Sequence, residues 1–436
     1  MVDDSGGAFW DLERYRRDTV EEYVERRRER QRIRLGYDGN GMVLFWVALR
    51  TVLLTILTLG LYRFWMITRM RRIYWGSIRI DGDPLEYTGR GIEKLLGFLL
   101  AVVVLAVYLG AVNLALTFAG LSFAADDPVV LQLSLQLSAL SALPFIYYAA
   151  YRAQRYMLAR TRWRGIRFGL GPGAVGYTIR SLGWTVITVV TLGLAWPYQH
   201  FKQAKYITDR AYLGDMPFRQ EGGWGELFAQ WIWLYILGGL GALMVWGLVE
   251  NPDDTTAWFL GTLVLSFGGM VLLLAFQRYQ VAAFRILWSG RHLGDSAFEN
   301  DLSAGRVLGI YIGGSMAVGI CSGLLAALIT VALFVVAGEF VGAEQLAAAM
   351  QADDPSGLLA AWPQILAGAL GYLTLLGFAF AFTQVFLTMP ILRAKVEGMT
   401  VSDPVALTST RQRPHDAAAE AGGFADALGV DVGAGL

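Results

Sequence analysis

Long apolar stretches without any lysine or arginine alternate with short polar stretches along this chain. Lys and Arg are absent from three windows, residues 95–151, 227–277 and 307–392. Each window holds two apolar stretches of the length needed to cross about 30 Å of hydrocarbon, with an acidic link between them. The pattern therefore predicts six transmembrane helices arranged as three hairpins.

The charges beside these windows predict an orientation. Residues 152–167 contain six arginines and no acidic residue, whereas Asp126 and Asp127 lie in the link within the first window. Segments rich in Lys and Arg stay in the cytoplasm, so the links lie outside and both termini lie inside. Residues 1–40 lack the apolar core of a signal peptide, which agrees with a cytoplasmic N-terminus.

Two further apolar segments, residues 42–65 and 181–198, have basic residues on both sides. If both crossed the membrane, the basic stretches 69–94 and 152–180 would lie outside, against the positive-inside rule. We therefore expect re-entrant or interfacial segments that other parts of the protein cover. Hydropathy alone supports the alternative of eight spans.

These two segments resemble each other. Thr58 and Gly60 in the first correspond to Thr191 and Gly193 in the second, each within a Thr-Leu-Gly-Leu sequence that we expect to form the bend. The correspondence predicts internal repeats, with a membrane domain at residues 36–401 divided into 36–174, 175–300 and 301–401.

Glycine turns recur beside short β-prone stretches. Ser77 to Ile80 precede Gly82, and similar turns are expected at Gly165, Gly214 and Gly294. We interpret these sites as small cytoplasmic β-hairpins in one layer below the membrane, where strands from different repeats could pair. The predicted fold class is therefore an all-α polytopic membrane protein with six transmembrane helices, two re-entrant segments, small β-hairpins and internal repeats.

Composition agrees with a membrane protein and excludes several kinds of site. The 436 residues are 55% hydrophobic and 17% charged, with a mean hydropathy of +0.45, and 36 basic residues balance 36 acidic ones. No basic excess indicates nucleic-acid binding. Cys321 is the only cysteine and there are three histidines, so neither a metal site nor a cofactor is expected.

Several motifs together resemble a known family. The segments Thr58–Trp65, Gly82–Gly89, Arg160–Phe168 and Thr191–Leu194 are similar to the characteristic blocks of the YjgN-like bacterial inner-membrane proteins, a family of unknown function. The resemblance covers about residues 36–401. It implies a multi-pass protein of the bacterial cytoplasmic membrane, and it implies no catalytic or binding residue. Residues 1–35, expected to form a cytoplasmic Arg/Glu-rich helix, and residues 402–436, expected to be a disordered cytoplasmic tail, lie outside it.

Arg50 and Arg180 are the candidate functional residues. Each lies in or at the start of one of the two segments that we expect to be re-entrant. Their guanidinium groups either line a polar cavity or bind an anion such as a lipid phosphate, or they reach the headgroups along the membrane surface.

Two functions remain open. A permease or channel for a small solute agrees with repeated, interrupted membrane segments, although the predicted spans contain no Asp, Glu, His, Lys or Arg. The alternative is a membrane scaffold or lipid-interacting protein that acts through its cytoplasmic hairpin layer. No nucleophile motif or catalytic cluster indicates an enzyme. Membrane lipids are the expected partners, and the sequence identifies no solute or protein partner.

Overall fold

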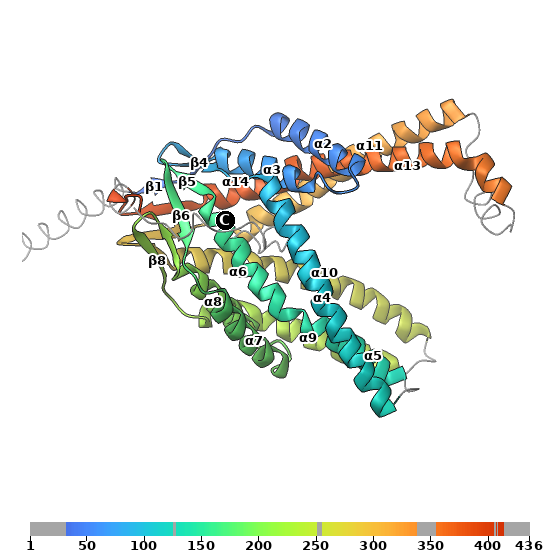
Figure 1. Ribbon diagram of the computed structural model, residues 1–436, viewed down its shortest axis with the longest axis horizontal. Helices are drawn as coiled ribbons and strands as arrows, with labels where there is room; N and C mark the ends of the chain where they lie inside the picture. Colours follow the sequence, from blue (N-terminus) through green and yellow to red (C-terminus); the bar gives the residue numbers. More distant parts are fainter. Residues whose placement is uncertain are drawn as a thin grey trace, which may run out of the picture.

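Long helices extend from one side of a small sheet in this protein (Figure 1). A computed structural model describes residues 32–124, 128–250, 255–337, 355–404, 407 and 409–413. The strands are β1 (Ile33–Arg34), β2 (Gly36–Tyr37), β3 (Ile78–Ile80), β4 (Asp83–Tyr87), β5 (Thr161–Trp163), β6 (Ile166–Leu170), β7 (Ala211–Leu213), β8 (Met216–Gln220), β9 (Arg291–Leu293), β10 (Ser296–Asn300) and β11 (Met399–Ser402). The helices are α2 (Gly41–Leu57), α3 (Arg63–Ser77), α4 (Gly91–Ala124), α5 (Pro128–Ser141), α6 (Leu143–Ala159), α7 (Ala174–Val190), α8 (Trp196–Thr208), α9 (Gly225–Glu250), α10 (Thr255–Ser289), α11 (Ala304–Ala337), α13 (Pro355–Thr383) and α14 (Met389–Glu397), with a π-helical turn η1 (Gln384–Thr388) between the last two.

The sheet nearly closes on itself. Its eleven antiparallel strands follow the order β1-β11-β10-β9-β8-β7-β6-β5-β4-β3-β2. Only Leu35 separates β1 from β2, and its N–H donates to the Met399 carbonyl at 3.0 Å. The two ends of the strand order therefore meet in a barrel-like ring.

The predicted all-α fold class is wrong. Strands of two to five residues carry little hydrophobic pattern, so the sequence indicated hairpins that could pair in a layer but not an eleven-stranded sheet. Strands that lie far apart in the chain pair with each other, as at Ile33 with Val401 and Leu85 with Trp163, and join those hairpins into one sheet. Hydrogen-bond partners at such separations leave no local signal.

The first two β-hairpin turns have positive φ angles at two consecutive residues, of which the second is glycine. Asp81 and Gly82 have φ angles of 53° and 83°, and Arg164 and Gly165 have 50° and 77°. Two consecutive residues with positive φ form a type I′ turn, whose twist matches that of the flanking strands.

Helical hairpins connect the β-hairpins and extend from one side of the ring (Figure 1). They are α2 with α3, α4 with α5 and α6, α7 with α8, α9 with α10, and α11 with α13 and α14. Contacts of α3 with α4, α6 with α7, α8 with α9, α10 with α11 and α13 with α2 place them in a closed cyclic order.

Five helices of the described residues, rather than six, are long and apolar enough to cross a membrane. They are Gly91–Ala119, Gly225–Glu250, Gly261–Ser289, Ala304–Leu333 and Leu366–Glu397. The second half of the first window instead forms α5 and α6, which are 14 and 17 residues long. Ala142 lies between them as the N-cap of α6, and α6 begins with Leu143 and Pro144. Six spans in three hairpins are therefore also a wrong prediction.

The two Thr-Leu-Gly-Leu segments are the turns of the shorter hairpins. Leu59 and Leu192 have φ angles of 50° and 52°, and Gly60 and Gly193 have 92° and 93°. The Gly60 N–H donates to Thr55 and the Gly193 N–H to Thr188, both at 2.7 Å. Both turns lead into a second helix, α3 or α8, that returns to the sheet (Figure 1).

Candidate functional site

The inside of the sheet ring is packed with apolar side chains. Cross-strand pairs inside the ring are Leu85 with Trp163, Phe168 with Leu213, Phe218 with Leu293 and Phe298 with Val401. Within this group Trp163, Leu213, Leu293 and Val401 are at most 1% exposed. The ring therefore contains a hydrophobic core at this level, continuous with the core formed by α2, α3 and the ends of α10 and α14.

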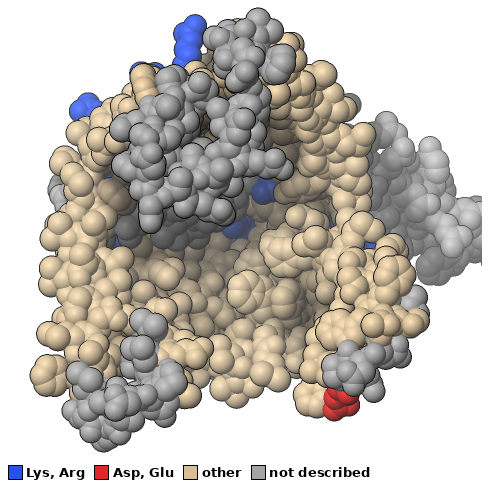
Figure 2. All heavy atoms as spheres, turned by 90° about the vertical axis from the view of Figure 1, so that its right-hand side faces the viewer, with Lys and Arg blue, Asp and Glu red and all other residues tan. Residues whose placement is uncertain are grey.

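The opposite end of the molecule is hollow. Figure 2 looks toward the helix ends that lie far from the sheet and shows a deep concavity between walls of residues other than Lys, Arg, Asp and Glu. A few basic atoms are visible at its floor. The helices that form these walls cover one another little, since at most 11% of the most apolar window of each is buried.

A smaller cavity of about 380 Å³ lies where α10, α11 and α14 meet the sheet, and we call it the α10–α14 cavity. Its volume is within the range typical of small-molecule sites. The apolar part of its wall comes mainly from α10 and from the start of α11. Its charged and polar lining residues are His200, Gln277, Gln280, Arg291 and Lys395.

Two cations give this cavity a positive charge. The guanidinium of Arg291 lies 4.0 Å from the centre of the Trp288 ring, and the ammonium of Lys395 lies 4.6 Å from that of Phe284. Burial lowers the pKa of Arg291 to about 10, so the group is still protonated at neutral pH. Burial also lowers the pKa of His200, whose imidazole is therefore neutral. Among the described residues that line the cavity there is no Asp or Glu.

Neither Arg50 nor Arg180 lines the α10–α14 cavity. Arg50 is exposed in the middle of α2. Arg180 is exposed on α7, donates to the Gly176 carbonyl at 3.1 Å and lies 5.4 Å from the Tyr206 ring centre. A role for either residue in binding an anion stays a prediction.

Thr58 and Thr191 stabilise the turns that contain Gly60 and Gly193. The Thr58 hydroxyl donates to the Leu54 carbonyl and accepts from the Tyr62 N–H, at 2.7 and 2.9 Å. The Thr191 hydroxyl does the same with Ile187 and Ala195, at 2.8 and 3.1 Å. These contacts are internal to each turn, and both turns lie at hairpin tips rather than at the cavity.

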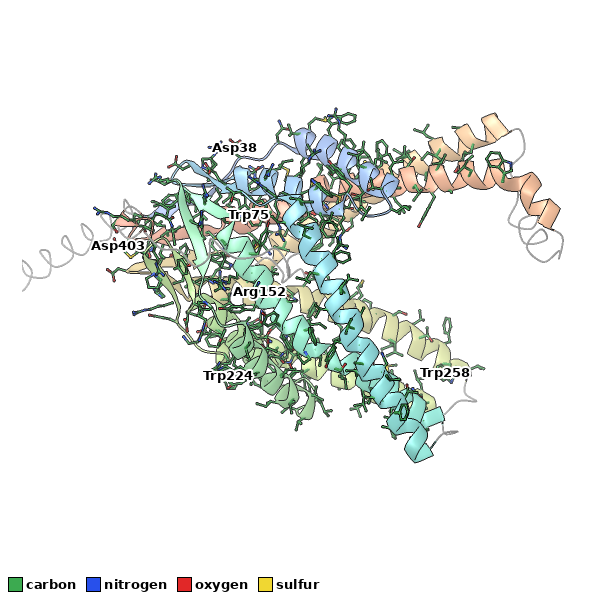
Figure 3. The ribbon with its side chains drawn as sticks, viewed as in Figure 1. Asp38, Trp75, Arg152, Trp224, Trp258 and Asp403 are labelled. Carbon is green, nitrogen blue, oxygen red and sulfur yellow. The ribbon has the colours of Figure 1, made fainter. Side chains whose placement is uncertain are left out.

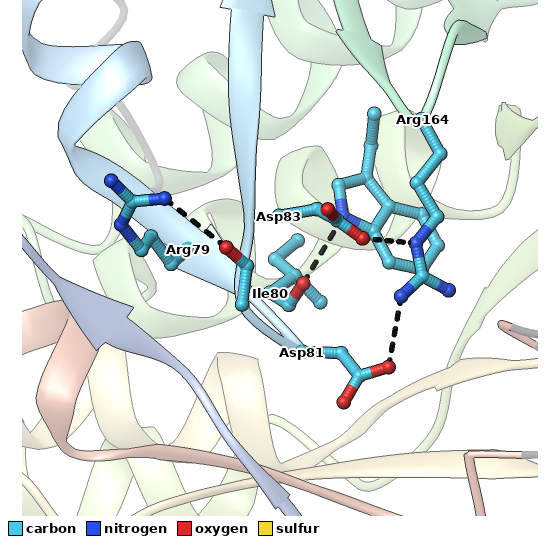
Figure 4. A network of polar contacts seen from close by, with 7 residues as sticks. Arg79, Ile80, Asp81, Asp83 and Arg164 are labelled. Carbon is cyan, nitrogen blue, oxygen red and sulfur yellow. Dashed lines mark hydrogen bonds and ion pairs between the residues drawn. The ribbon is translucent and has the colours of Figure 1, made fainter.

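Asp81 and Asp83 have structural partners. The Arg164 guanidinium donates to Asp81 at 2.9 Å and also to Asp83, so it joins two neighbouring hairpin turns (Figure 4). Both carboxylates and the arginine are exposed, so the pairs contribute little stability. The described residues contain no group of three or more His, Cys, Asp or Glu side chains that could hold a metal ion.

Sequence reasoning missed Arg291 and Lys395. Both residues lie beside apolar windows, where basic residues indicate the cytoplasmic side of the membrane, and that interpretation gave no reason to single them out. The signal that could have identified Arg291 is its position at the start of a short strand. The corresponding short strands β3, β5, β7 and β11 begin with uncharged residues, which are Ile78, Thr161, Ala211 and Met399.

Comparison with known proteins identifies the family of this chain. Neither the curated proteins nor the solved structures contain a match. A family model described as "Bacterial protein of unknown function (DUF898)" matches residues 32–427, which is most of the chain. The match confirms the resemblance to a bacterial family of unknown function, and the five apolar helices suggest a membrane protein. The chain is therefore a member of the DUF898 family of bacterial proteins.

Proposed function

We propose that this chain is a lipid-interacting, multi-pass protein of the bacterial cytoplasmic membrane and has no catalytic activity. In this proposal the five long apolar helices cross the bilayer, α5 and the start of α6 return the chain after α4, and the sheet and both termini lie on the cytoplasmic side. The orientation is supported by Arg79, Arg162 and Arg167 on the strands, because basic residues concentrate on the cytoplasmic side of membrane proteins.

The observation that carries the proposal is the exposure of the long helices. No residue in the most apolar window of α11 is buried, and only 6% of the corresponding window of α9 is buried. Leaving one large apolar side chain in water instead of burying it costs about 1.5–3 kcal/mol, and these helices expose dozens. Lipid hydrocarbon chains can cover these apolar side chains without the cost of exposing them to water, both around the molecule and inside the hollow seen in Figure 2.

Tryptophans at the two ends of one hairpin also support a membrane position. Trp224 precedes α9 and Trp258 lies near the start of α10, so they lie at opposite ends of the α9–α10 hairpin (Figure 3). They are 43% and 41% exposed. The 26 residues of α9 extend over about 39 Å, close to the distance between two membrane interfaces, where Trp is enriched.

A permease or channel for a small solute is the second candidate, because the hollow offers space for a solute. The packed ring argues against this candidate. Trp163 and Leu293 are buried inside the sheet ring. A solute could therefore pass from the hollow through the ring only if this core opened.

Lipid retention and solute flux separate the two candidates. We expect the full chain, extracted in polymer discs and then transferred to mild detergent, to retain several phospholipids for each protein molecule. We also expect vesicles that contain it to release entrapped ions and small dyes no faster than empty vesicles. Protein that retains no lipid but conducts solute would contradict the proposal.

A further inference from the structure

Two arginines lie against one tyrosine ring at the sheet end of the α7–α8 hairpin. The guanidinium carbons of Arg210 and Arg180 lie 3.7 Å and 5.4 Å from the centre of the Tyr206 ring. Tyr206 is 8% exposed near the end of α8, and its hydroxyl donates to the Gly173 carbonyl at 3.0 Å. A ring fixed in this way holds both cations in place. We call Arg180, Arg210 and Tyr206 the Tyr206 cluster.

The Tyr206 cluster surrounds the first turn of α7. A Cβ added to Gly173 would lie 3.2 Å from Nε of Arg210, and one added to Gly176 would lie 3.0 Å from Nη1 of Arg180. Gly173 is the N-cap of α7 and has no side chain to accept from the first N–H groups of the helix. The guanidinium donors and these N–H donors therefore lie close together, and all of them suit an anion.

The α2–α3 hairpin has the same plan but lacks this cluster. The side chain of Asn40 caps α2 and accepts from two N–H groups at 2.9 and 3.2 Å, whereas α7 has a glycine at that place. Val47 is the seventh residue of α2, as Arg180 is of α7. Ser77 comes directly before β3, as Arg210 comes directly before β7. The fold of such a hairpin therefore requires neither arginine.

No carboxylate contacts Arg180 or Arg210 in the described part of the chain. Besides the tyrosine ring, each side chain donates to one main-chain carbonyl, at 3.1 Å for Arg180 and 3.3 Å for Arg210. Asp209, next to Arg210 in the chain, instead lies 3.2 Å from the Lys205 ammonium and accepts from an N–H group of β8 at 2.8 Å. Because a guanidinium has five N–H donors, both arginines keep donors for a ligand.

The outer face of α7 favours a ligand that carries acyl chains. Val175, Ile179 and Val186 are 63%, 65% and 61% exposed. Their spacings of four and seven residues are close to whole helical turns, so the three side chains lie along one face. This face extends from the exposed Arg180 toward the tip of the hairpin. A phosphate at the Tyr206 cluster therefore has an apolar surface beside it on which its acyl chains can lie.

We propose that Arg180 and Arg210 together bind one phosphate group at the first turn of α7. Tyr206 is the positioning residue, because both guanidinium groups lie against its ring. The phosphate belongs to the headgroup of an anionic phospholipid or to a soluble phosphate ester, and the exposed face of α7 favours the lipid. The lipid source rests on the function proposed above, whereas the phosphate site itself does not.

Calorimetric titration of the delipidated full chain in non-ionic detergent tests the site and its source. The probes are short-chain phosphatidylglycerol, glycerol phosphate, which lacks the acyl chains, and short-chain diacylglycerol, which lacks the phosphate. We expect phosphatidylglycerol to bind at least ~10-fold more tightly than diacylglycerol, because hydrogen bonds to a charged group add to the apolar contact. Weaker binding of glycerol phosphate supports a lipid ligand, and equal binding supports a soluble ester. Binding by neither phosphate probe, or equal binding of diacylglycerol, would overturn the proposal.

Substitutions locate the site. We expect Arg180→Gln and Arg210→Gln each to weaken binding of the tighter phosphate probe roughly 10-fold, since a charged donor is lost. Arg69→Gln is the matched control, because the Arg69 guanidinium lies 5.5 Å from the Tyr62 ring centre in the α2–α3 hairpin, outside the cluster. Wild-type affinity in both folded cluster variants would overturn the proposal. Arg180 is exposed, so at least its variant should fold.

Two substitutions of Tyr206 test the positioning role. Tyr206→Leu removes the ring and should weaken binding of the same probe several-fold, because the guanidinium groups lose the surface that holds them. Tyr206→Phe keeps the ring and should restore most of the binding, although it loses the hydrogen bond to Gly173. Unfolding midpoints measured in parallel identify any loss that comes from stability. A folded Tyr206→Leu protein with wild-type affinity would contradict the positioning role.

Total retained lipid separates this inference from the proposed function. Because the hollow offers a much larger apolar surface than the cluster, we expect the Arg180→Gln and Arg210→Gln proteins to retain the wild-type amount of phospholipid phosphorus. Loss of phosphate binding with unchanged total lipid supports the Tyr206 cluster as the site. A wild-type protein that retains no phospholipid contradicts the proposed function, whereas a lipid-retaining wild type that binds neither phosphate probe contradicts only the site.

Discussion

Arg411 and Asp215 bind each other through two hydrogen bonds, although they lie 196 residues apart. The Arg411 N–H donates to the Asp215 carboxylate at 2.9 Å, and the Asp215 N–H donates to the Arg411 carbonyl at 2.9 Å. Leu407, a few residues earlier, is 5% exposed within the core of the ring. This part of the chain thus attaches to the turn between β7 and β8, and Leu407 adds to the core.

Removing the Asp215 carboxylate should loosen this attachment. We expect Asp215→Ala to speed tryptic cleavage after Arg411 roughly 5- to 10-fold, because losing one hydrogen bond raises the population of the detached state. Peptide mass spectrometry over a digestion time course measures the rate. Asp295→Ala is the control, since Asp295 has the same place in the Gly294–Asp295 turn; equal cleavage in both variants would show that the contact does not hold the segment.

Gly60 and Gly193 need the backbone freedom of glycine. Their φ angles of 92° and 93° are unfavourable for any side chain with a Cβ, although neither site has an atom within 4 Å of an added Cβ. Gly60→Ala and Gly193→Ala should therefore each reduce the free energy of unfolding by about 1–2 kcal/mol through strain alone.

Gly76→Ala provides the control for these variants. Gly76 lies within α3, also has no atom within 4 Å, and has an ordinary φ angle. Alanine favours a helix over glycine, so this change should leave the protein as stable or more stable. Thermal unfolding in detergent gives the comparison, and a midpoint for Gly193→Ala equal to that for Gly76→Ala would exclude strain at the turn.

Local sequence predicted the hairpins and a layer in which they could pair, but not the nearly closed sheet that they form. Gly82, Gly165, Gly214 and Gly294 indicated turns, and the structure has a turn with positive φ at each of them. The pairing of β1 with β11 consists of two residue pairs, Ile33 with Val401 and Arg34 with Thr400. No periodicity can be recognised in strands of that length, so an all-α class was the natural but wrong prediction.

The number of spans was wrong for a similar reason. Residues 128–151 are apolar over a length sufficient to cross a membrane, which predicted one helix. The break at Ala142 depends on one proline, Pro144, at the start of α6. The α10–α14 cavity could not be predicted either. Arg291 and Lys395 lie 104 residues apart, and only the closed order of the helical hairpins brings β9 and α14 to one cavity.

Tyr151 should make stability depend on pH above 10. Burial and the neighbouring Tyr206 raise the pKa of Tyr151 from 10 to about 12, and its hydroxyl donates to the Gly171 carbonyl at 2.7 Å. Between these two values the unfolded tyrosine has released its proton and the folded one has not. The folded state binds more protons, so the free energy of unfolding falls as pH rises from 10 to about 12.

The variant Tyr151→Phe isolates this contribution. It removes the titrating group, so its stability should fall less steeply over the same pH range, while its stability below pH 10 is lower because the Gly171 contact is lost. Unfolding midpoints at several pH values measure the slope. An unchanged slope in the variant would assign the pH dependence to other buried groups, such as Tyr74, whose pKa burial also raises.

The proposed orientation predicts which residues an impermeant reagent can reach. Glu250 ends α9 on the side far from the sheet, and Asp295 lies in a turn of the sheet (Figure 1). With the native thiol removed by Cys321→Ser, a cysteine introduced as Glu250→Cys should react with a charged maleimide added outside intact cells. Asp295→Cys should react only after the membrane is permeabilised, because its turn lies beside the basic strands that the positive-inside rule places in the cytoplasm. Reaction of Asp295→Cys alone would mean that the sheet lies outside, and reaction of both from outside would mean that α9 does not cross the membrane.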